Sequence, residues 1–332
     1  MTSFRQLAAV LISAVSLSLP AHALDTAARS AMVIDMSSGA VLLEKNVDTP
    51  MPPASMSKLM TLNMVFEALQ QGRLSLDERF RVSVKAWKMG GSKMFVREGD
   101  RIRIEDLIRG VIIHSGNDAC VVLAEGLAGS EDAFSQRMTE RARELGMDMS
   151  TFANSTGWPH PSHRMSARDL IFLTQRMITE FPEYYHYFAE TDFTWDKVSQ
   201  KNRNPLLYLD IGADGLKTGH TEEAGFGLVG SAIRNDRRVA FIISGLDTAK
   251  ARSVESERLV TWAFREFKTG KIANAGQIVG EAEVWIGDAD TVPLAPKEDV
   301  IATAPYGELD GMKVSVRYDG PIEAPIALGQ PI

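Results

Sequence analysis

A serine and a lysine stand three residues apart at the start of an expected helix, in Ser55-Met56-Ser57-Lys58. This spacing is about one helical turn, so both side chains emerge on the same face and can touch. A serine hydroxyl is a poor nucleophile until a neighbouring base takes its proton, and a lysine with a lowered pKa can be that base. The same pattern also arises by chance, as an exposed serine beside a solvated lysine. Partner residues must decide between the two interpretations.

Two further short patterns are candidate partners. Ser115-Gly116-Asn117 lies between two expected helices, where the serine could pass on a proton and the asparagine could hold the lysine and a substrate amide. Lys217-Thr218-Gly219 opens a strand-rich region. A lysine and a hydroxyl at a strand edge can receive a carboxylate, and a glycine there lets a peptide lie against the strand. Together the three patterns predict a nucleophile, a base, a proton path and a carboxylate receptor.

The three patterns resemble the Ser-x-x-Lys, Ser-x-Asn and Lys-Thr-Gly motifs of serine β-lactamases and penicillin-binding proteins. Longer stretches, at residues 114–120, 214–221 and 256–262, are similar to low-molecular-mass D-Ala-D-Ala carboxypeptidases. The resemblance extends from about Ala31 to the C-terminus. It implies an enzyme without a cofactor that removes the terminal D-alanine from peptidoglycan stem peptides ending in D-Ala-D-Ala. It also implies that β-lactam antibiotics inhibit the enzyme by acylating it.

The resemblance implies a catalytic role for each matching residue. Ser55 would be acylated by the penultimate D-alanine carbonyl, and water would then hydrolyse the acyl-enzyme. Lys58 would be the general base, with Ser115 and Asn117 completing the proton path. The backbone N–H groups of Ser55 and His220 would form the oxyanion hole.

The substrate carboxylate would be held by Lys217 and Thr218. Arg252 matches a family arginine near that carboxylate, and Arg203 is expected to support the same pocket. The alternative for either arginine is a surface or structural position. Cys120, the only cysteine, matches a family position close to the active site. Either thiol reagents inhibit through it, or it is a small buried apolar side chain.

Rival functions share parts of this pattern. A class A β-lactamase needs a glutamate between the second and third motifs, and the Glu-x-x-Leu-Asn pattern that would supply it is absent between Asn117 and Lys217. We therefore expect penicillin to acylate Ser55 and to leave slowly. A DD-endopeptidase remains an alternative. Complete motifs disfavour a non-catalytic periplasmic scaffold, and the six histidines lack the ligand spacing of a zinc peptidase.

Residues 1–23 have the pattern of a secretory signal peptide. Arg5 precedes an apolar stretch at residues 7–19, and Pro20 leads to Ala21-His22-Ala23, a cleavage signal. The apolar stretch falls short of the roughly 20 residues that cross a bilayer, so we expect export to the periplasm. The net charge of −7 argues against nucleic acid as a partner.

The element pattern predicts an α+β fold, with an antiparallel sheet flanked by helices plus a helical lobe. Strands are expected at residues 31–35 and 40–44, joined as a hairpin by Ser37-Ser38-Gly39, and at 225–233 and 238–245, joined as a second hairpin by Asn235-Asp236. Helices are expected at 55–69, 105–113, 118–127 and 253–268, the last ended by Gly270. Ser130 is expected to cap a further helix, and Ser166 with Asp169 to open another.

A small all-β domain is expected after this core. Short strands at residues 281–287, 300–304 and 312–318 stand among Pro and Gly. The expected organisation is a signal peptide at 1–23, a transpeptidase-like catalytic domain at 24–271 and a β domain at 272–332 that looks incomplete. The resemblance implies that family members usually add an amphipathic membrane-anchoring helix after this domain, and we expect no such membrane anchor within this chain.

Overall fold

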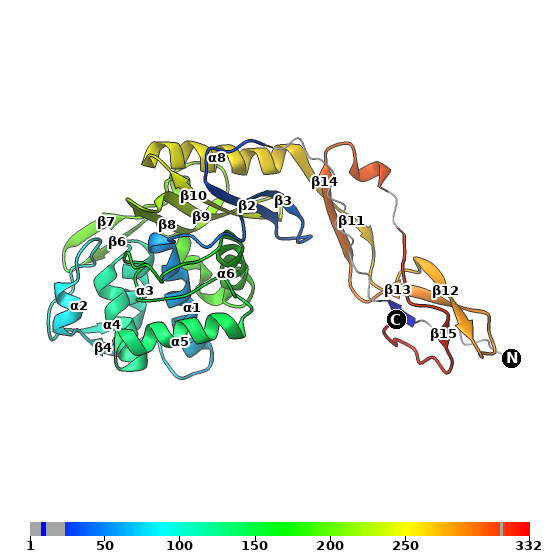
Figure 1. Cartoon of the computed structure of the whole chain (residues 1–332), viewed down its shortest axis with the longest axis horizontal. Helices are drawn as coiled ribbons and strands as arrows, with labels where there is room; N and C mark the ends of the chain where they lie inside the picture. Colours follow the sequence, from blue (N-terminus) through cyan, green and yellow to red (C-terminus); the bar gives the residue numbers. More distant parts are fainter. Residues whose placement is uncertain (1–7, 11–23, 313–314) are drawn as a thin grey trace. The chain divides into compact units, whose positions relative to one another are not determined.

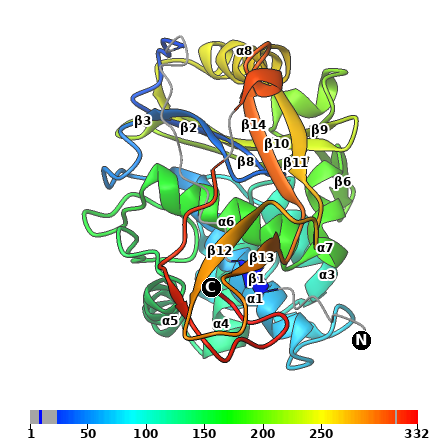
Figure 2. The ribbon, with the colours of Figure 1, turned by 90° about the vertical axis from the view of Figure 1, so that its right-hand side faces the viewer.

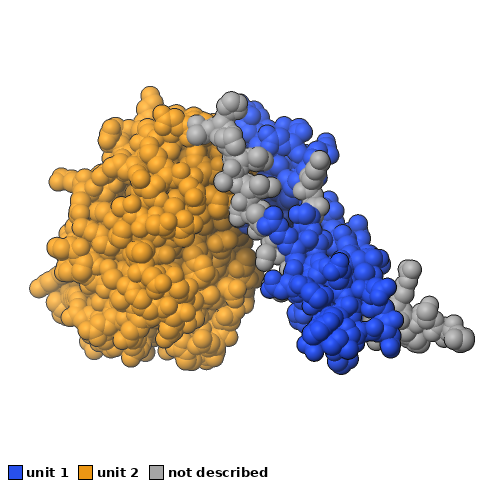
Figure 3. All heavy atoms as spheres, turned by 45° about the vertical axis from the view of Figure 1, so that its right-hand side comes forward, with its two compact units in different colours: residues 1–22, 37–40, 265–332 blue, residues 23–36, 41–264 orange. Residues whose placement is uncertain are grey.

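The computed structural model describes residues 8–10, 24–312 and 315–332, and the chain forms two compact units (Figure 3). The larger unit contains residues 23–36 and 41–264. The smaller unit contains residues 37–40 and 265–332 together with a short strand at 8–10. The rest of the expected signal peptide lies outside the described residues.

A five-stranded antiparallel sheet in the order β3-β2-β10-β9-β8 is the framework of the larger unit. Its strands are β2 (Ser30–Asp35), β3 (Val41–Lys45), β8 (Ala213–Thr221), β9 (Gly225–Arg234) and β10 (Arg237–Leu246). Both predicted hairpins are confirmed. The β9–β10 turn is Asn235-Asp236, and both residues have positive φ, as a tight two-residue hairpin turn requires. Strand β8 lies at the edge of the sheet.

Helices cover both faces of this sheet. Helix α8 (Ala249–Glu266) lies over one face, and α6 (Ala167–Thr179) packs on the other (Figure 2). Because both faces are covered, β10 is buried almost throughout and has no apolar–polar alternation. The other helices form the lobe beside α6 (Figure 1): α1 (Lys58–Gln70), α2 (Val84–Lys88), α3 (Ile104–Ile112), α4 (Asn117–Ala128), α5 (Glu131–Glu144) and α7 (Pro182–Tyr185).

Short elements connect these helices. Three are single turns, η1 (Ala54–Ser57), η2 (His186–Ala189) and η3 (Pro205–Tyr208). Two are small hairpins, β4 (Arg79–Arg81) with β5 (Arg101–Arg103) and β6 (Asp192–Trp195) with β7 (Val198–Lys201). The core lies between the sheet and the lobe, where Phe66 of α1 stacks on Tyr184 of α7 with ring centroids 5.0 Å apart.

The predicted helix caps are present. Ser130 Oγ accepts a hydrogen bond from the Ala133 N–H at 3.1 Å, and Ser166 Oγ accepts one from the Asp169 N–H at 3.0 Å. The predicted end of the last helix at Gly270 is wrong. Helix α8 ends at Glu266 because the next residues pair as strand β11 with β14. Gly270 lies within that strand, where an added Cβ would be 2.7 Å from Leu309 Cδ2.

Among its described residues, the smaller unit is all β apart from one turn. One sheet has the order β1-β13-β12-β15, and β11 pairs with β14. The elements are β1 (Ala8–Val10), β11 (Phe267–Ala273), β12 (Gly280–Trp285), β13 (Thr291–Pro296), β14 (Val300–Pro305), η4 (Leu309–Gly311) and β15 (Ile322–Glu323). The predicted α+β class with a small all-β domain is confirmed.

The strand predicted at residues 312–318 is wrong for the residues there that the structure describes, 312 and 315–318. Val316 and Tyr318 pack their side chains on the small core around Leu294. The Tyr318 hydroxyl accepts a hydrogen bond from the Glu283 N–H at 3.0 Å. The apolar alternation of this segment therefore reflects side-chain packing without strand pairing. No helix among residues 24–312 and 315–332 is long and apolar enough to span a membrane.

Candidate active site

Ser55 lies in the turn η1, which leads directly into α1 at Lys58. η1 is a 3₁₀ turn with three residues per turn, so side chains at positions i and i+3 eclipse one another. Lys58 Nζ accordingly lies 2.9 Å from Ser55 Oγ. Ala54, just before the serine, has a φ of 48°. A non-glycine residue in this left-handed region costs about 1–3 kcal/mol, so the surrounding packing must hold the serine turn in place.

Lys58 is fully buried and makes two further contacts. Its Nζ donates to Asn117 Oδ1 at 2.6 Å and lies 3.5 Å from Ser115 Oγ. The pKa of Lys58 is lowered to about 8, chiefly by burial. The positive charge of Arg203 contributes to this lowering, and the carboxylate of Asp118 opposes it. At pH 7 about a tenth of the molecules therefore hold this amine in its neutral form.

The loop between α3 and α4 brings Ser115 and Asn117 to the lysine. Ser115 has a φ of 56°, and the Gly116 N–H donates to the Gly110 carbonyl at 2.9 Å. The Asn117 N–H donates to the Ser92 carbonyl at 2.7 Å, and Asn117 Nδ2 donates to the Gly90 carbonyl at 2.9 Å. The Asn117 amide is thus fixed with its oxygen towards Lys58.

Asp118 organises the segment that receives Asn117. Its buried carboxylate accepts hydrogen bonds from the N–H groups of Met94 at 2.8 Å, Phe95 at 2.8 Å and Val96 at 3.2 Å. A carboxylate that receives several backbone N–H groups holds a loop without regular structure firmly. This role of Asp118 is not predictable from the sequence, because its spacing from residues 94–96 carries no signal.

Strand β8 contributes the third motif. Lys217 and Thr218 are buried, whereas His220 is exposed and stacks on Phe226 of β9 with ring centroids 3.8 Å apart. Burial holds the pKa of Lys217 well below its usual value, and the nearby charges of Lys58 and Arg203 add to the effect. Lys217 therefore shares one electrostatic environment with Lys58.

Close packing explains why position 219 is a glycine. A Cβ added at Gly219 would lie 3.0 Å from Met56 Cγ, 3.0 Å from the Pro53 carbonyl oxygen and 3.2 Å from Ala54 Cβ. The missing side chain allows β8 to pack against the serine turn. That Gly219 also lets a substrate backbone lie against the strand stays a prediction. The close packing does bring His220 and the Ser55 turn, the two expected oxyanion donors, onto neighbouring elements.

Two arginines, Arg203 and Arg252, join Lys58 and Lys217 in a cluster of cations. Burial lowers the pKa of both Arg203 and Arg252, and the charge of Arg203 also lowers that of Arg252. The Arg252 guanidinium lies 5.8 Å from the ring centroid of Phe226, and its Nε is buried without a hydrogen-bond partner. Arg203 Nη1 donates to Ser92 Oγ. Within the described part of the chain, no ion pair involves either arginine, Lys58 or Lys217. Uncompensated cations of this kind favour an anionic ligand.

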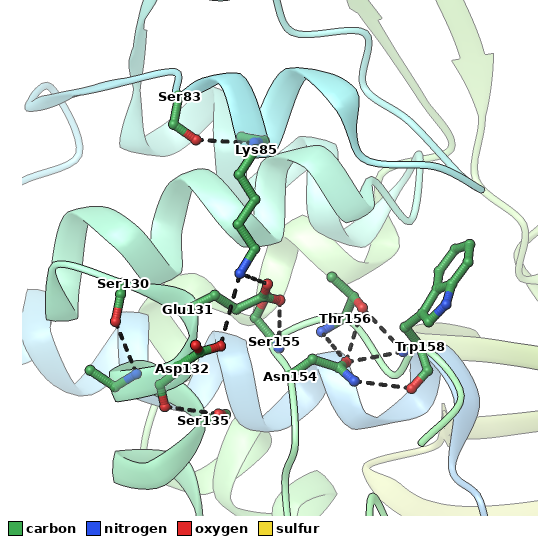
Figure 4. A network of polar contacts seen from close by, with 12 residues as sticks. Ser83, Lys85, Ser130, Glu131, Asp132, Ser135, Asn154, Ser155, Thr156 and Trp158 are labelled. Carbon is green, nitrogen blue, oxygen red and sulfur yellow. Dashed lines mark hydrogen bonds and ion pairs between the residues drawn. The ribbon is translucent and has the colours of Figure 1, made fainter.

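A second loop supports the serine turn (Figure 4). The buried carboxylate of Glu131 accepts hydrogen bonds from the Ser155 N–H at 3.1 Å and Ser155 Oγ at 2.7 Å, and it pairs with Lys85 Nζ at 2.8 Å. Thr61 Oγ1, on α1, donates to the Ser155 carbonyl at 2.7 Å. The loop therefore joins α1 to α5. The site residues predicted from the sequence do not include this loop.

Asn154 closes this loop into a tight turn. Its Oδ1 accepts hydrogen bonds from the N–H groups of Thr156, Gly157 and Trp158 and from Thr156 Oγ1, all within 3.1 Å. Gly157 has a φ of 80°, and an added Cβ would lie 1.9 Å from the Ala54 carbonyl oxygen. The loop is thus pressed directly against the residue before Ser55. An Asn three residues before a Gly is the signal that could have indicated this turn.

Cys120 is a free, fully buried thiol on α4. Burial raises its pKa to about 12. Because thiol reagents react with exposed thiolates, this environment favours the alternative of a small buried apolar side chain over a reactive thiol.

Two family models match this chain. Residues 17–248 match the D-alanyl-D-alanine carboxypeptidase family, peptidase S11, and residues 267–332 match the C-terminal domain of penicillin-binding protein 5. The chain belongs to the D-alanyl-D-alanine carboxypeptidase family of serine hydrolases. The family and the enzyme class predicted from the sequence are confirmed.

Individual relatives cover most of the chain. D-alanyl-D-alanine carboxypeptidase DacD of Escherichia coli is 36% identical over 91% of this chain and 80% of the relative. The structure of penicillin-binding protein 5 from Haemophilus influenzae has a TM-score of 0.85 and 36% identity, covering 92% of this chain and 91% of that one. Penicillin-binding protein D2 from Listeria monocytogenes, solved in its ampicillin-bound form, has a TM-score of 0.66 and 32% identity, covering 73% and 98%.

Proposed function

We propose that this enzyme hydrolyses the terminal D-Ala-D-Ala bond of peptidoglycan stem peptides through an acyl-enzyme on Ser55. The observation that carries the proposal is the 2.9 Å separation of Lys58 Nζ and Ser55 Oγ. The pKa of this lysine is lowered to about 8, so the neutral amine is accessible near neutral pH. A neutral amine at hydrogen-bond distance can accept the hydroxyl proton as the oxygen attacks.

In the acylation step, Ser55 Oγ forms a bond to the carbonyl carbon of the penultimate D-alanine. Its proton passes to Lys58 Nζ, and the backbone N–H groups of Ser55 and His220 receive the developing oxyanion. The C–N bond then breaks, and a proton passes through Ser115 Oγ to the leaving amine of the terminal D-alanine. Asn117 supports the step by fixing Lys58 at 2.6 Å.

The carboxylate of the departing D-alanine is proposed to bind at the cluster of cations. Lys217 and Thr218 would contact it from β8, with Arg203 and Arg252 supplying further positive charge. The unpartnered Nε of Arg252 supports this assignment, since a buried donor without an acceptor costs about 1–3 kcal/mol and a carboxylate would satisfy it. A substrate peptide whose terminal carboxylate is replaced by an amide should therefore bind poorly.

In the deacylation step, water attacks the ester carbonyl and gives a proton to Lys58 Nζ. The C–Oγ bond then breaks, and Lys58 returns a proton to Ser55 Oγ, which regenerates the free serine. β-Lactams are proposed to acylate Ser55 in the same way, and the resulting acyl-enzyme is proposed to be hydrolysed slowly. A relative 32% identical to this chain was solved in its ampicillin-bound form, which supports the binding of β-lactams. Slow release is supported by the sequence between Asn117 and Lys217, which lacks the Glu-x-x-Leu-Asn pattern that supplies the water-activating glutamate of a class A β-lactamase.

Export to the periplasm is part of the proposal. Residues 1–23 would be a signal peptide removed after Ala23, residues 24–271 the catalytic domain and residues 272–332 a separate β domain. Protein recovered from a periplasmic fraction should therefore begin at Leu24 by mass spectrometry. Recovery from the cytoplasm with an intact N-terminus would contradict the export proposal.

Covalent labelling with a fluorescent penicillin, combined with a product assay, tests the catalytic proposal. Wild-type protein should label at one site, and Ser55→Ala should not. Ser57→Ala is the matched control, since the Ser57 hydroxyl donates to the Ala54 carbonyl at 3.1 Å and should be dispensable for labelling. A pentapeptide ending in D-Ala-D-Ala should release free D-alanine.

Other outcomes would reassign the enzyme. Cleavage of cross-linked dimers in preference to pentapeptides would make it a DD-endopeptidase. Rapid turnover of penicillin would make it a β-lactamase. Labelling of Ser55→Ala, or no labelling of the wild type, would refute Ser55 as the nucleophile.

A further inference from the structure

Trp158 packs its ring against the segment that orients Asn117. A Cβ added at Gly91 would lie 2.9 Å from Trp158 Cζ3 and 2.8 Å from Asn117 Nδ2. At Gly90 an added Cβ would lie 3.5 Å from Trp158 Cη2. The backbone at Gly91 is therefore enclosed between the indole ring and the Asn117 side chain.

The Gly90 carbonyl is what fixes the Asn117 amide. Asn117 Nδ2 donates to it at 2.9 Å, while Asn117 Oδ1 accepts from Lys58 Nζ at 2.6 Å. If the amide turned over, its nitrogen would face the lysine amine, and two donors would oppose each other. A shift of the Gly90 carbonyl therefore changes the acceptor that Lys58 meets.

The backbone of Trp158 is itself held rigidly (Figure 4). Its N–H donates to Asn154 Oδ1 at 3.0 Å, and its carbonyl accepts from Asn154 Nδ2 at 3.0 Å. Ser155, in the same turn, is anchored to Glu131 and to Thr61 of α1. Trp158 nevertheless remains 47% exposed as a residue, so burial in the core does not account for it.

We infer that Trp158 is a positioning residue for the hydrolytic reaction, which holds the Gly90–Gly91 backbone against Asn117 and thereby keeps Asn117 on Lys58. The inference rests on the proposed function of these residues. The chain of contacts runs from Trp158 to Gly91, then through the Gly90 carbonyl to Asn117 and Lys58. A misplacement of about 1 Å in such a set slows catalysis by up to about 100-fold.

Trp158→Ala tests the inference, with Trp285→Ala as the matched control. Trp285 is 58% exposed and lies in the smaller unit, so its loss removes an exposed indole far along the chain from the site residues. The measurement is the second-order rate constant of acylation by several penicillins with different side chains, normalised to the protein that finally labels. We expect the rate constant of Trp158→Ala to be about 10- to 100-fold lower than that of the wild type for every penicillin, while the variant still labels fully. Trp285→Ala should match the wild type.

A purely structural role or a direct ligand contact would give different results. A structural role would reduce the fraction that labels and leave the normalised rate constant unchanged. A direct contact would make the loss depend on the penicillin side chain. Either result, or a normalised rate constant within twofold of wild type, would overturn the inference.

Trp158→Tyr, which keeps a ring and changes its reach, covers the case in which the alanine variant does not fold. The rate constant of Trp158→Tyr should lie between those of the wild type and Trp158→Ala. A value equal to that of the wild type would also overturn the inference. Wild-type labelling and its loss in Ser55→Ala are measured in the same series. Failure of the proposed function is therefore seen separately from failure of this inference.

Discussion

Replacing Gly157 with alanine tests whether the loop at residues 154–158 and the serine turn share one tightly packed contact. The added Cβ would lie 1.9 Å from the Ala54 carbonyl oxygen, 2.5 Å from the Ala54 carbonyl carbon and 2.7 Å from Ser57 Oγ. The first two are backbone atoms, which cannot rotate away, so one of the two segments must move. The residue that moves with Ala54 is Ser55.

Gly146→Ala is the matched control. Gly146 has a φ of 78° against 80° for Gly157, and an added Cβ would meet nothing within 4 Å. Both variants therefore share the cost of a left-handed alanine, about 1–2 kcal/mol, and the same gain from a stiffer unfolded chain. Only Gly157→Ala adds the overlap, which costs about 1–3 kcal/mol.

Urea unfolding measures the difference directly. Gly157→Ala should lose about 1–3 kcal/mol more unfolding free energy than Gly146→Ala. Its acylation by penicillin should also slow, because Ser55 moves relative to Lys58, whereas Gly146→Ala should acylate at the wild-type rate. Equal stability of the two variants, together with equal acylation rates, would refute the packing described for this loop.

Further predictions concern the lysine, the carboxylate and the thiol. The acylation rate should rise with pH with a midpoint near pH 8, measured by stopped flow, because the neutral Lys58 amine is the base and burial lowers its pKa to about 8. A flat profile between pH 6 and 9 would contradict it. Asp118→Asn should lower the unfolding free energy by about 1–3 kcal/mol in urea, because an amide NH₂ then faces the N–H groups of residues 94–96. Cys120 should resist iodoacetamide in the folded protein and react in urea, as followed by mass spectrometry, because it is buried and its pKa is raised to about 12.

Local patterns predicted the elements of the larger unit well. The Asn235-Asp236 turn, the Ser130 cap and the Ser55–Lys58 spacing each depend on interactions within four residues, and such interactions can be seen in a sequence. The resemblance to a known family then supplied the roles expected of the distant residues.

Contacts between distant segments could not be predicted from the residues themselves. Lys58 and Asn117 are 59 positions apart, and only the folded lobe brings them to 2.6 Å. The reason for Gly219 and the support from Glu131 also depend on which segments pack together. In the smaller unit, the alternation at residues 312–318 satisfied a strand pattern, yet the described residues there pack through their side chains. Periodicity reports which side chains are buried and does not report which backbone groups pair.

Because the pKa of Lys58 is lowered, the stability of the fold also changes with pH in the alkaline range. Its pKa is about 8 in the folded protein against 10.5 for an unperturbed lysine. Below pH 8 the amine is protonated in both states, and holding that charge in the core costs about 3 kcal/mol. Between pH 8 and 10.5 the unfolded chain binds a proton that the folded chain does not, so stability rises with pH across this window. The property that makes the lysine a base is the same property that weakens the fold at neutral pH, and Lys217, shifted in the same direction, adds to it. Selection for catalysis at this site is therefore selection against stability, which the packed core of the larger unit must offset.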